Sequence, residues 1–450
     1  MTIRTNRSQH AWTPVFGWVL LSCVATGAQA QVDTVSPAKQ TLEQQSPDNN
    51  LPPLPDASVG GGTSPPAGGE LGVSVGAFTL YPALDIYAGY DNNVFATTTA
   101  PVASPVTVWR PTLELKSEWL NHSLRLLAGG GFGFYPSAST QNFQNYTLQA
   151  DGRLDIRNDV YLTGLIAYRR ATEALGTPNV SFAQAPTIAD SVPIEVGFYQ
   201  RFNRFFYQLG ASATKFWYYD YSTITELGLP AASRNMTGYQ ETIRLGYELS
   251  ETVTLFIAPG FNQRIYDQTV NSAGQNRNST GFNFGVGGSY TLSAKTSLEA
   301  SIGYTSQYTA SDGSTTAATA FNLGGSWNGY EPLMLRPVIS RSINESALTG
   351  YQNYISTIYG LDWVYDVHYP WKAIGGLSYN TADYTPVPGT GTPPRTDYFF
   401  KGSLGLLYEV RPQYSIGPVY EYTQGWTTDV LTGGPQFSRS LLSVRLVVRR

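Results

Sequence analysis

The chain has 450 residues, and its composition excludes most classes of soluble protein. Asp, Glu, Lys and Arg make up 13% of it, aromatic residues also reach 13%, and 45 residues are Gly. So few charges could not coat an ordinary soluble globule of this size, and so many aromatics do not suit a disordered chain. The mean hydropathy is −0.19, and beyond the N-terminus no apolar run reaches the roughly 18 residues of a helical membrane span. A polar average with many Tyr and Gly is typical of a transmembrane β-barrel.

The first 30 residues have the pattern of a secretory signal peptide. Arg4 and Arg7 precede an apolar stretch at 15–24, and Ala28-Gln-Ala30 supplies a small-residue cleavage site. We therefore predict that residues 1–30 direct export and are removed after Ala30. Leu20-Leu-Ser-Cys23 also resembles the lipobox of bacterial lipoproteins, which leaves lipidation of Cys23 as an alternative.

Residues 31–76 are rich in Pro and Gly and contain little that could pack, so we predict a disordered periplasmic linker. Residues 77–450 then form the barrel. Cleavage after Ala30 would remove the only Cys and change the formal net charge from −4 to −6. Because no basic tract remains, nucleic acid is not expected as a partner.

From about Ala77 onward, apolar and polar residues alternate with a period of two. The clearest example lies between Trp109 and Trp119, where Arg110, Thr112, Glu114, Lys116 and Glu118 alternate with Trp109, Pro111, Leu113, Leu115 and Trp119. Successive side chains of a strand point to opposite faces. One face is therefore expected to contact lipid, with aromatics at both interfaces, and the other to face the lumen.

The alternation recurs often enough to predict about eighteen strands, opening at Ala83–Tyr90 and ending with one near Phe437. Tight turns are expected at Asn121-His122, Asn158-Asp159, Asn203-Arg204, Ser250-Glu-Thr252, Ser293-Ala-Lys-Thr296 and Arg411-Pro412, and long loops at 92–105, 171–191, 218–236, 267–280 and 380–396. Alternating turns and loops predict an all-β, transmembrane, antiparallel, up-and-down β-barrel in the outer membrane. An even strand number would place the N- and C-termini in the periplasm. A strand edge finds no hydrogen-bond partner in lipid, so the sheet must close.

The polar faces of these strands supply the candidate lumen-lining residues. They are Arg110, Glu114, Lys116, Glu118, Arg125, Asp151, Arg153, Asp155, Arg157, Arg201, Arg244 and Glu248. Charges of both signs are interleaved, which suits either ion pairs that stiffen the wall or a ring that selects what passes. Aromatic residues that could stack on sugar rings are Tyr87, Tyr199, Trp217, Tyr218 and Tyr219; each could equally belong to an interfacial girdle.

No pattern in the sequence supports an enzyme. The three His residues are His10, His122 and His368, and none shares a strand with a suitably placed acid and Ser. No Cys/His/Asp cluster has the spacing of a metal site, so no catalytic, cofactor-binding or metal residue is assigned. Asp91-Asn-Asn93 and Asp312-Gly313 are interpreted as turns rather than calcium ligands.

The segment Phe78-Thr-Leu-Tyr-Pro-Ala-Leu-Asp-Ile-Tyr-Ala-Gly-Tyr-Asp-Asn-Asn-Val-Phe95 resembles the opening of the putative beta-barrel porin 2 family. The first strand of that family begins with apolar residues and a Pro. It runs into a turn of acidic and Asn residues, and an apolar pair follows the turn. The resemblance covers about 77–450 and implies an outer-membrane barrel of a kind often associated with exopolysaccharide or capsule export. It brings no catalytic motif.

Three functions are compatible with these features. The first is a channel through which an exported exopolysaccharide leaves the cell, with periplasmic export-complex proteins as partners. The second is a general or sugar-specific uptake porin, which could be a homo-oligomer. The third is a structural or adhesive barrel whose lumen is plugged. Outer-membrane lipid is a partner in all three.

Overall fold

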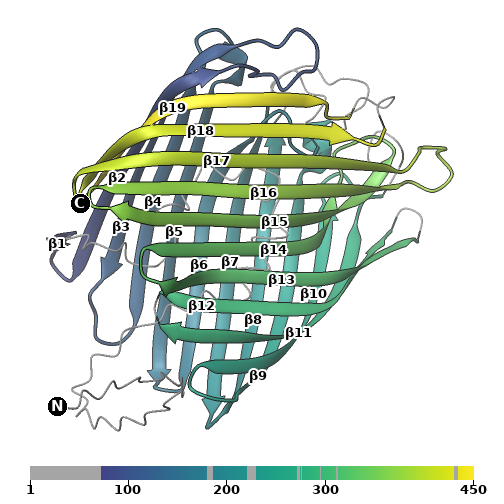
Figure 1. Ribbon diagram of the computed structural model, residues 1–450. Coiled ribbons are helices and arrows are strands. Elements are labelled where there is room, and N and C mark those ends of the chain that lie inside the picture. Colours follow the sequence, from purple (N-terminus) through teal and green to yellow (C-terminus); the bar gives the residue numbers. More distant parts are fainter. Residues whose placement is uncertain are drawn as a thin grey trace, which may run out of the picture. The chain divides into compact units, whose positions relative to one another are not determined.

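The computed structural model describes residues 72–179, 186–219, 230–270, 274, 276–293, 295–310, 313–429 and 434–450. The predicted signal peptide, Cys23 and nearly all of the predicted linker lie outside these ranges. Almost every described segment is a β-strand or a connection between strands (Figure 1). No helix among the described residues has the length and apolarity that crossing a membrane would need.

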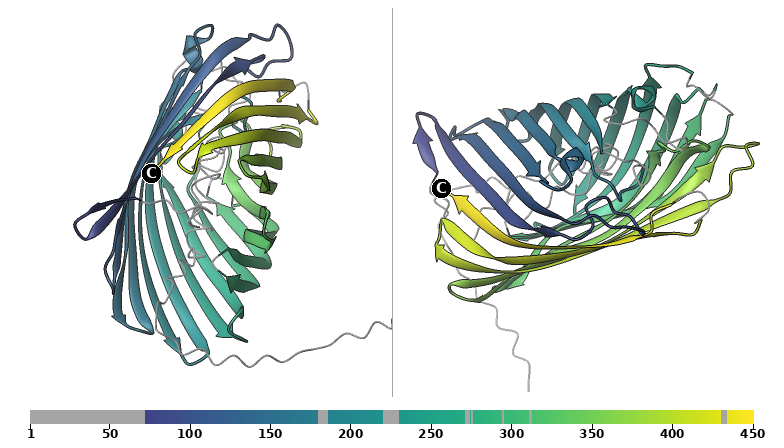
Figure 2. Two further views of the ribbon diagram at one scale, coloured as in Figure 1. Left: turned by 60° about the vertical axis from the view of Figure 1, so that its left-hand side comes forward. Right: turned by 90° about the horizontal axis from the view of Figure 1, so that it is seen from above.

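The strands pair in chain order, and the last one pairs with β2, so that eighteen strands close into an antiparallel barrel (Figure 2). This closure confirms the predicted fold class and strand number. The eighteen strands are β2 (Phe78–Asp91), β3 (Ser104–Ser117), β4 (Ser123–Phe134), β5 (Phe143–Arg157), β6 (Val160–Glu173), β7 (Thr187–Phe202), β8 (Phe205–Tyr219), β9 (Met236–Glu248), β10 (Val253–Tyr266), β11 (Ser279–Ser293), β12 (Thr296–Thr309), β13 (Thr315–Tyr330), β14 (Leu333–Glu345), β15 (Tyr351–His368), β16 (Trp371–Pro386), β17 (Arg395–Arg411), β18 (Tyr414–Thr427) and β19 (Phe437–Arg449).

Short and long connections alternate around the barrel, and we call its two ends the turn end and the loop end. The turn end carries the connections after β3, β5, β7, β9, β11, β13, β15 and β17. The loop end carries the connections after β2, β4, β6, β8, β10, β12, β14, β16 and β18. The short turns lie within a residue or two of every turn that was predicted, apart from the one after β3, which is longer.

Four features differ from the prediction. A short strand, β1 (Val73–Val75), lies within the predicted linker and forms a hairpin with β2 through Gly76, whose φ of 64° suits a residue without a Cβ. Glu118 lies beyond the end of β3, in the turn. The loops predicted at 171–191 and 380–396 are shorter, because β7 begins at Thr187 and β16 continues to Pro386. Polar strand ends at the loop end lack the apolar alternation by which strands were predicted.

The two faces of the wall differ in chemistry, as β3 shows. Trp109 and Leu113 are 46% and 50% exposed on the outer face, whereas Arg110 is 7% exposed on the inner face. On the outer face of β16 to β18, the rings of Tyr379, Tyr398 and Trp426 lie 5.4 to 6.4 Å apart between centroids. Such a belt suits a membrane interface, where the apolar body of an aromatic ring and its polar tip are both satisfied.

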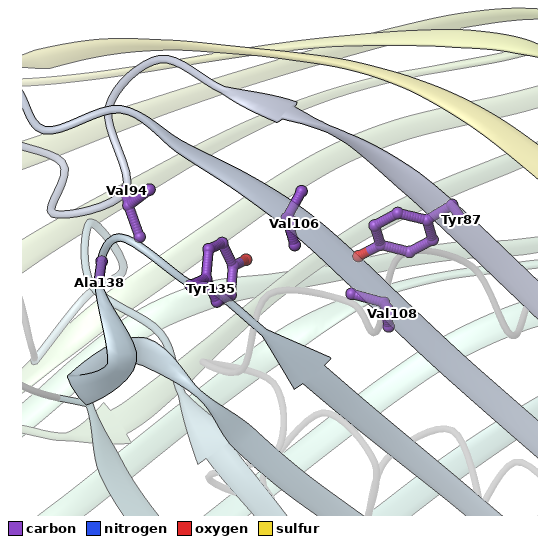
Figure 3. Packing of buried hydrophobic residues seen from close by; sticks show 6 residues of the cluster. All are labelled: Tyr87, Val94, Val106, Val108, Tyr135 and Ala138. Carbon is purple, nitrogen blue, oxygen red and sulfur yellow. The ribbon is translucent and has the colours of Figure 1, made fainter.

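A small apolar cluster lies at the loop end of β2 to β4 (Figure 3). It is made of Tyr87, Val94, Val106, Val108, Tyr135 and Ala138, drawn from two strands and from the loops at 92–103 and 135–142. Val94 and Val108 are 2% or less exposed. Because these two loops pack against each other and against β2 and β3, they are held in place on the wall.

Candidate pore and its constriction

Four of the predicted charges of β3, β4 and β5 form one connected network on the inner face, and two more form a separate pair. Arg125 lies 2.8 Å from Asp151 and 3.4 Å from Glu114, and Lys116 lies 3.2 Å from the same Glu114. Arg153 contacts Asp155 at 2.6 Å on the same strand. Each charge thus has a partner of opposite sign on its own strand or on a neighbouring one, so this side of the wall presents paired dipoles.

The remaining predicted charges lie in smaller groups. Arg110 contacts Asp85 at 3.7 Å and the hydroxyl of Tyr87 at 3.3 Å. Arg201 lies at the turn end, 2.9 Å from Asp159 and 3.5 Å from Glu248. Arg157 ends β5 and, like Glu118, is exposed at the turn end. Their part in a conducting lumen remains a prediction.

Arg244 shows directly which face is the inner one. From β9 it donates to Glu299 on β12 at 2.8 and 3.0 Å, across the two intervening strands. Its guanidinium lies 3.4 Å from the ring centroid of Phe256 on β10. Side chains converge in this way only on the concave face of a curved sheet. The ring of Phe256 in turn occupies the space that a side chain at Gly287 would need.

At the loop end, two segments from distant parts of the wall meet inside the barrel. Asn179, in the connection after β6, donates to the carbonyl of Glu345 at 3.2 Å and accepts from the backbone N–H of Ala347 at 2.9 Å. The backbone N–H of Asn179 donates to the hydroxyl of Tyr384 at 3.3 Å. Since β6 and β14 are eight strands apart in the ring, these bonds span the lumen and narrow it.

The carboxylate of Glu345 is the second centre of this constriction. Arg264 of β10 contacts it at 2.6 Å, Arg277 lies 3.6 Å away, and the Tyr266 hydroxyl donates to it at 2.5 Å. Arg264 and Arg277 also donate to the backbone carbonyls of Ile343 and Ser346 at 2.9 and 2.6 Å. A carboxylate held by two hydrogen bonds and a further ion pair is well fixed in position.

A buried ion pair ties a third segment to the same end. Arg234, in the short helix η3 (Ala231–Arg234) after β8, makes a bidentate pair with Glu173 at 2.7 and 2.8 Å. The guanidinium lies 4.0 Å from the ring centroid of Tyr218. Burial alone would lower the pKa of Arg234, but the adjacent Glu173 carboxylate outweighs it, so the pKa is raised and the group stays charged.

The aromatics proposed for sugar stacking do not offer free ring faces inside the barrel. Tyr87 and Tyr218 are buried, and Trp217 and Tyr219 lie on the outer face. Tyr199 is on the inner face near the turn end, but its ring stacks on Tyr161 at 4.6 Å and on Phe206 at 5.5 Å. Because its neighbours cover both faces, stacking on a sugar ring finds no support in these five residues.

The residues with possible catalytic chemistry have structural partners. The Nδ1 atom of His122 accepts from the backbone N–H of Asp155 at 3.0 Å, and Nδ1 of His368 lies 2.7 Å from the carbonyl of Tyr369. Within the part of the chain that the structure describes, no group of three His, Cys, Asp or Glu could hold a metal ion. The arrangement is that of a wall and a constriction.

Sequence reasoning did not identify Asn179, Glu345, Arg277 or the pair of Glu173 with Arg234. All lie at strand ends or in loops, where no alternation exists to mark them. For the four charged residues among them, the one available signal was their type, since the chain is otherwise poor in charge.

Comparison with known proteins gives low-identity likenesses to outer-membrane barrels. The siderophore receptor PirA from Pseudomonas aeruginosa has a TM-score of 0.41 at 8% identity, with 82% of this chain and 80% of that one covered. For OccK3 (OpdO) from Pseudomonas aeruginosa the values are 0.41, 12%, 82% and 95%, and for the copper transporter OprC they are 0.42, 12%, 84% and 81%. No curated protein matches the sequence.

A family match covers the whole of the described barrel. Residues 65–450 match the family described as putative beta-barrel porin 2, which includes the whole ring from β2 to β19 and the short strand β1. A family of porin-like outer-membrane barrels agrees with the apolar outer face and the polar inner face of this chain. This chain therefore belongs to the putative beta-barrel porin 2 family and is an outer-membrane β-barrel protein.

Proposed function

We propose that this protein is a channel for a hydrophilic solute and that the solute is an exopolysaccharide leaving the cell. A ring of eighteen strands is wide enough to hold an aqueous path. We orient the barrel so that the turn end and both termini face the periplasm and the loop end faces outward. Bacterial barrels have short periplasmic turns and long outer loops in this way. Periplasmic export-complex proteins would then dock at the turn end.

The observation that carries the proposal is the pairing of charges on the inner face. A ring of unpaired charges of one sign would select small ions. Here Arg125 and Lys116 neutralise Asp151 and Glu114, and Arg244 neutralises Glu299. Such a wall is polar but produces little net electric field. It would therefore accommodate a hydrated, weakly charged chain of sugars better than it would select a single ion.

The proposal is tested by the polymer that cells release. A deletion strain should lose extracellular polysaccharide, and complementation with the full chain should restore it. Normal polymer together with slow growth on a scarce small sugar would instead identify an uptake porin. Planar-bilayer recordings of folded protein separate the export channel and the uptake porin from a plugged structural barrel, because the plugged barrel would not conduct.

The constriction gives the plugged barrel its only specific support, because loop-end segments do cross the lumen. The recordings should therefore include Glu345→Ala, which removes the carboxylate that holds two arginines. Conductance in this variant would show that the barrel is a channel that the constriction narrows. A silent variant that is correctly folded, as judged by heat-modifiable gel mobility, would favour the plug.

A further inference from the structure

The ladder between β13 and β14 is incomplete. Their paired residues run from Tyr330 with Leu333 at the turn end to Asn322 with Ser340 in the middle. Beyond this point the structure shows no pairing between the two strands: Thr315 to Phe321 pair with β12, and Arg341 to Glu345 pair with β15. A continued register would place Ala317 opposite Glu345.

The loop-end halves of β14 and β15 instead lie inside the barrel, against the inner face of their neighbours. Glu345 reaches past β13, β12 and β11 to Arg264 on β10. On β15, the Nδ2 atom of Asn353 donates to Oγ1 of Thr316, an inner-face residue of β13, at 3.0 Å. Asn353 and Tyr354 are successive residues, yet both are 2% exposed or less, so both faces of this part of β15 are covered.

Beneath these halves the wall carries uncharged amides in place of ion pairs. Asn262 of β10 and Gln307 of β12 both lie over Gly281 of β11: a Cβ there would come within 2.4 Å of Nδ2 of Asn262 and 2.2 Å of Oε1 of Gln307. Asn283 lies over Gly260 in the same way. The glycines let these amides lie flat, side by side, across three strands.

Two of these amides are not satisfied in the present arrangement. The Oδ1 atoms of Asn262 and Asn283 are buried and have no hydrogen-bond partner, and Asn262 is only 8% exposed. A buried acceptor without a partner is unfavourable, because it gives up its hydrogen bonds to water and gains none. The inward position therefore conceals a surface that could bind hydroxyl groups.

We propose that the loop-end halves of β14 and β15 form a gate over a recognition surface for uncharged, hydroxyl-rich solute, made of Asn262, Asn283 and Gln307. In the inward position, Asn179 and Glu345 hold the gate over the amides. In the outward position, Arg341 to Glu345 complete the ladder with β13 and the amides face the lumen. This inference rests on the proposed function and names the chemistry of its solute.

Solute can open such a gate because the amides are accessible in only one position. A ligand shifts an equilibrium only by its difference in affinity for the two states. Hydroxyl groups that bond to Asn262 and Asn283 gain those bonds in the outward position alone. The amides lack charge, so they would not distinguish solutes by net charge, whereas Arg264 and Arg277 next to them would repel cations.

A disulfide across the gate tests its movement. The side chain of Asn179 already reaches the backbone of Ala347, so the pair N179C/A347C should lock the gate inward under oxidising conditions. We expect oxidised protein in planar bilayers to conduct several-fold less than the same protein after reduction. The single variants N179C and A347C, in which the mature barrel has only one thiol after the predicted cleavage at Ala30, should not respond.

The outcomes separate the gate from the channel. Equal conductance of the oxidised and reduced pair, with the disulfide verified by mass, would overturn the gate and leave the channel standing. Absence of conductance in the wild type, in the reduced pair and in Glu345→Ala would overturn the proposed channel itself, and the gate with it.

Neutral dextran oligosaccharides test the recognition surface, with Glu345→Ala as the background so that the gate is open. Adding Asn262→Ala and Asn283→Ala should weaken current block by dextran about fivefold or more, a common size for such couplings. Ser289→Ala, on the inner face of β11 nearer the turn end, is the matched control and should leave block unchanged. Equal block in all three proteins would overturn the recognition surface.

Discussion

The ion pairs of the wall and those of the loop end differ in how far they reach. In the wall, Arg125 and Asp151 belong to neighbouring strands whose backbones are already hydrogen-bonded to each other. At the loop end, the pair of Arg234 with Glu173 joins a loop to a strand two places away, and that of Arg264 with Glu345 spans four. A pair of the first kind reinforces a ladder that would form without it. A pair of the second kind joins segments that no ladder connects.

Burial differs in the same direction. The side chains of Arg125 and Asp151 are 18% and 26% exposed, and those of Arg234 and Glu173 are 9% and 1% exposed. Water and the other charges of the network can replace a lost partner in the wall. No such replacement exists for Arg234. The comparison therefore predicts a gradient of mutational effects from the loop end to the wall.

The largest effect is expected for Glu173→Ala. It leaves the Arg234 charge buried without its partner, which typically costs about 3–5 kcal/mol of unfolding free energy. Urea unfolding in lipid vesicles, followed by heat-modifiable gel mobility, measures it. The double variant E173L/R234M should recover most of the loss. A loss in Glu173→Ala below about 1 kcal/mol, the size of an exposed pair, would remove the distinction between the two regions.

Gly287→Ala should have the next largest effect. A Cβ at this position would lie 2.3 Å from the Ala300 carbonyl oxygen and 2.6 Å from the Phe256 ring. Because a backbone atom cannot move aside easily, we expect a loss of about 1–3 kcal/mol in the same urea assay. Gly285→Ala on the same strand and face is the control, since its nearest atom is 4.0 Å away. Equal losses in both variants would rule out this close packing.

Arg244 and Glu299 offer an intermediate case, because they lie in the wall but reach across two strands. A double-mutant cycle with Arg244→Ala and Glu299→Ala should give a coupling of about 0.5–3 kcal/mol. The measurement is again the urea midpoint and slope. A coupling of zero would mean that neither the burial of an ion pair nor the number of strands that it spans predicts its coupling energy.

The smallest effect on stability is expected for Arg125→Ala, at about 0–1 kcal/mol. Glu114 keeps its contact with Lys116, and Asp151 keeps the hydrogen bond from the amide of Gln149 at 2.7 Å. The lost positive charge should instead shift the reversal potential of the channel towards cation selectivity in a salt gradient. An unchanged reversal potential would place Arg125 outside the conducting path.

The membrane-crossing part of the fold could be predicted from the sequence because lipid imposes a rule on every strand. Leu113 must face outward if Glu114 faces inward, so alternation fixes strand number, class and turns together. The loop end obeys no such rule, since both faces of its strands meet water or protein. Asn179 and Glu345 become neighbours only when the ring closes, and nothing local to either residue indicates the other.

The seam between β19 and β2 makes the integrity of the barrel depend on its last strand. Leu441 to Arg449 pair with Asp91 to Ala83, so the two strands most distant in sequence are the ones that remove each other's open edges. A chain that stops before β19 would keep seventeen strands and two edges, which hydrocarbon does not tolerate. A product truncated before β19 is therefore not expected to persist in the membrane as a folded barrel.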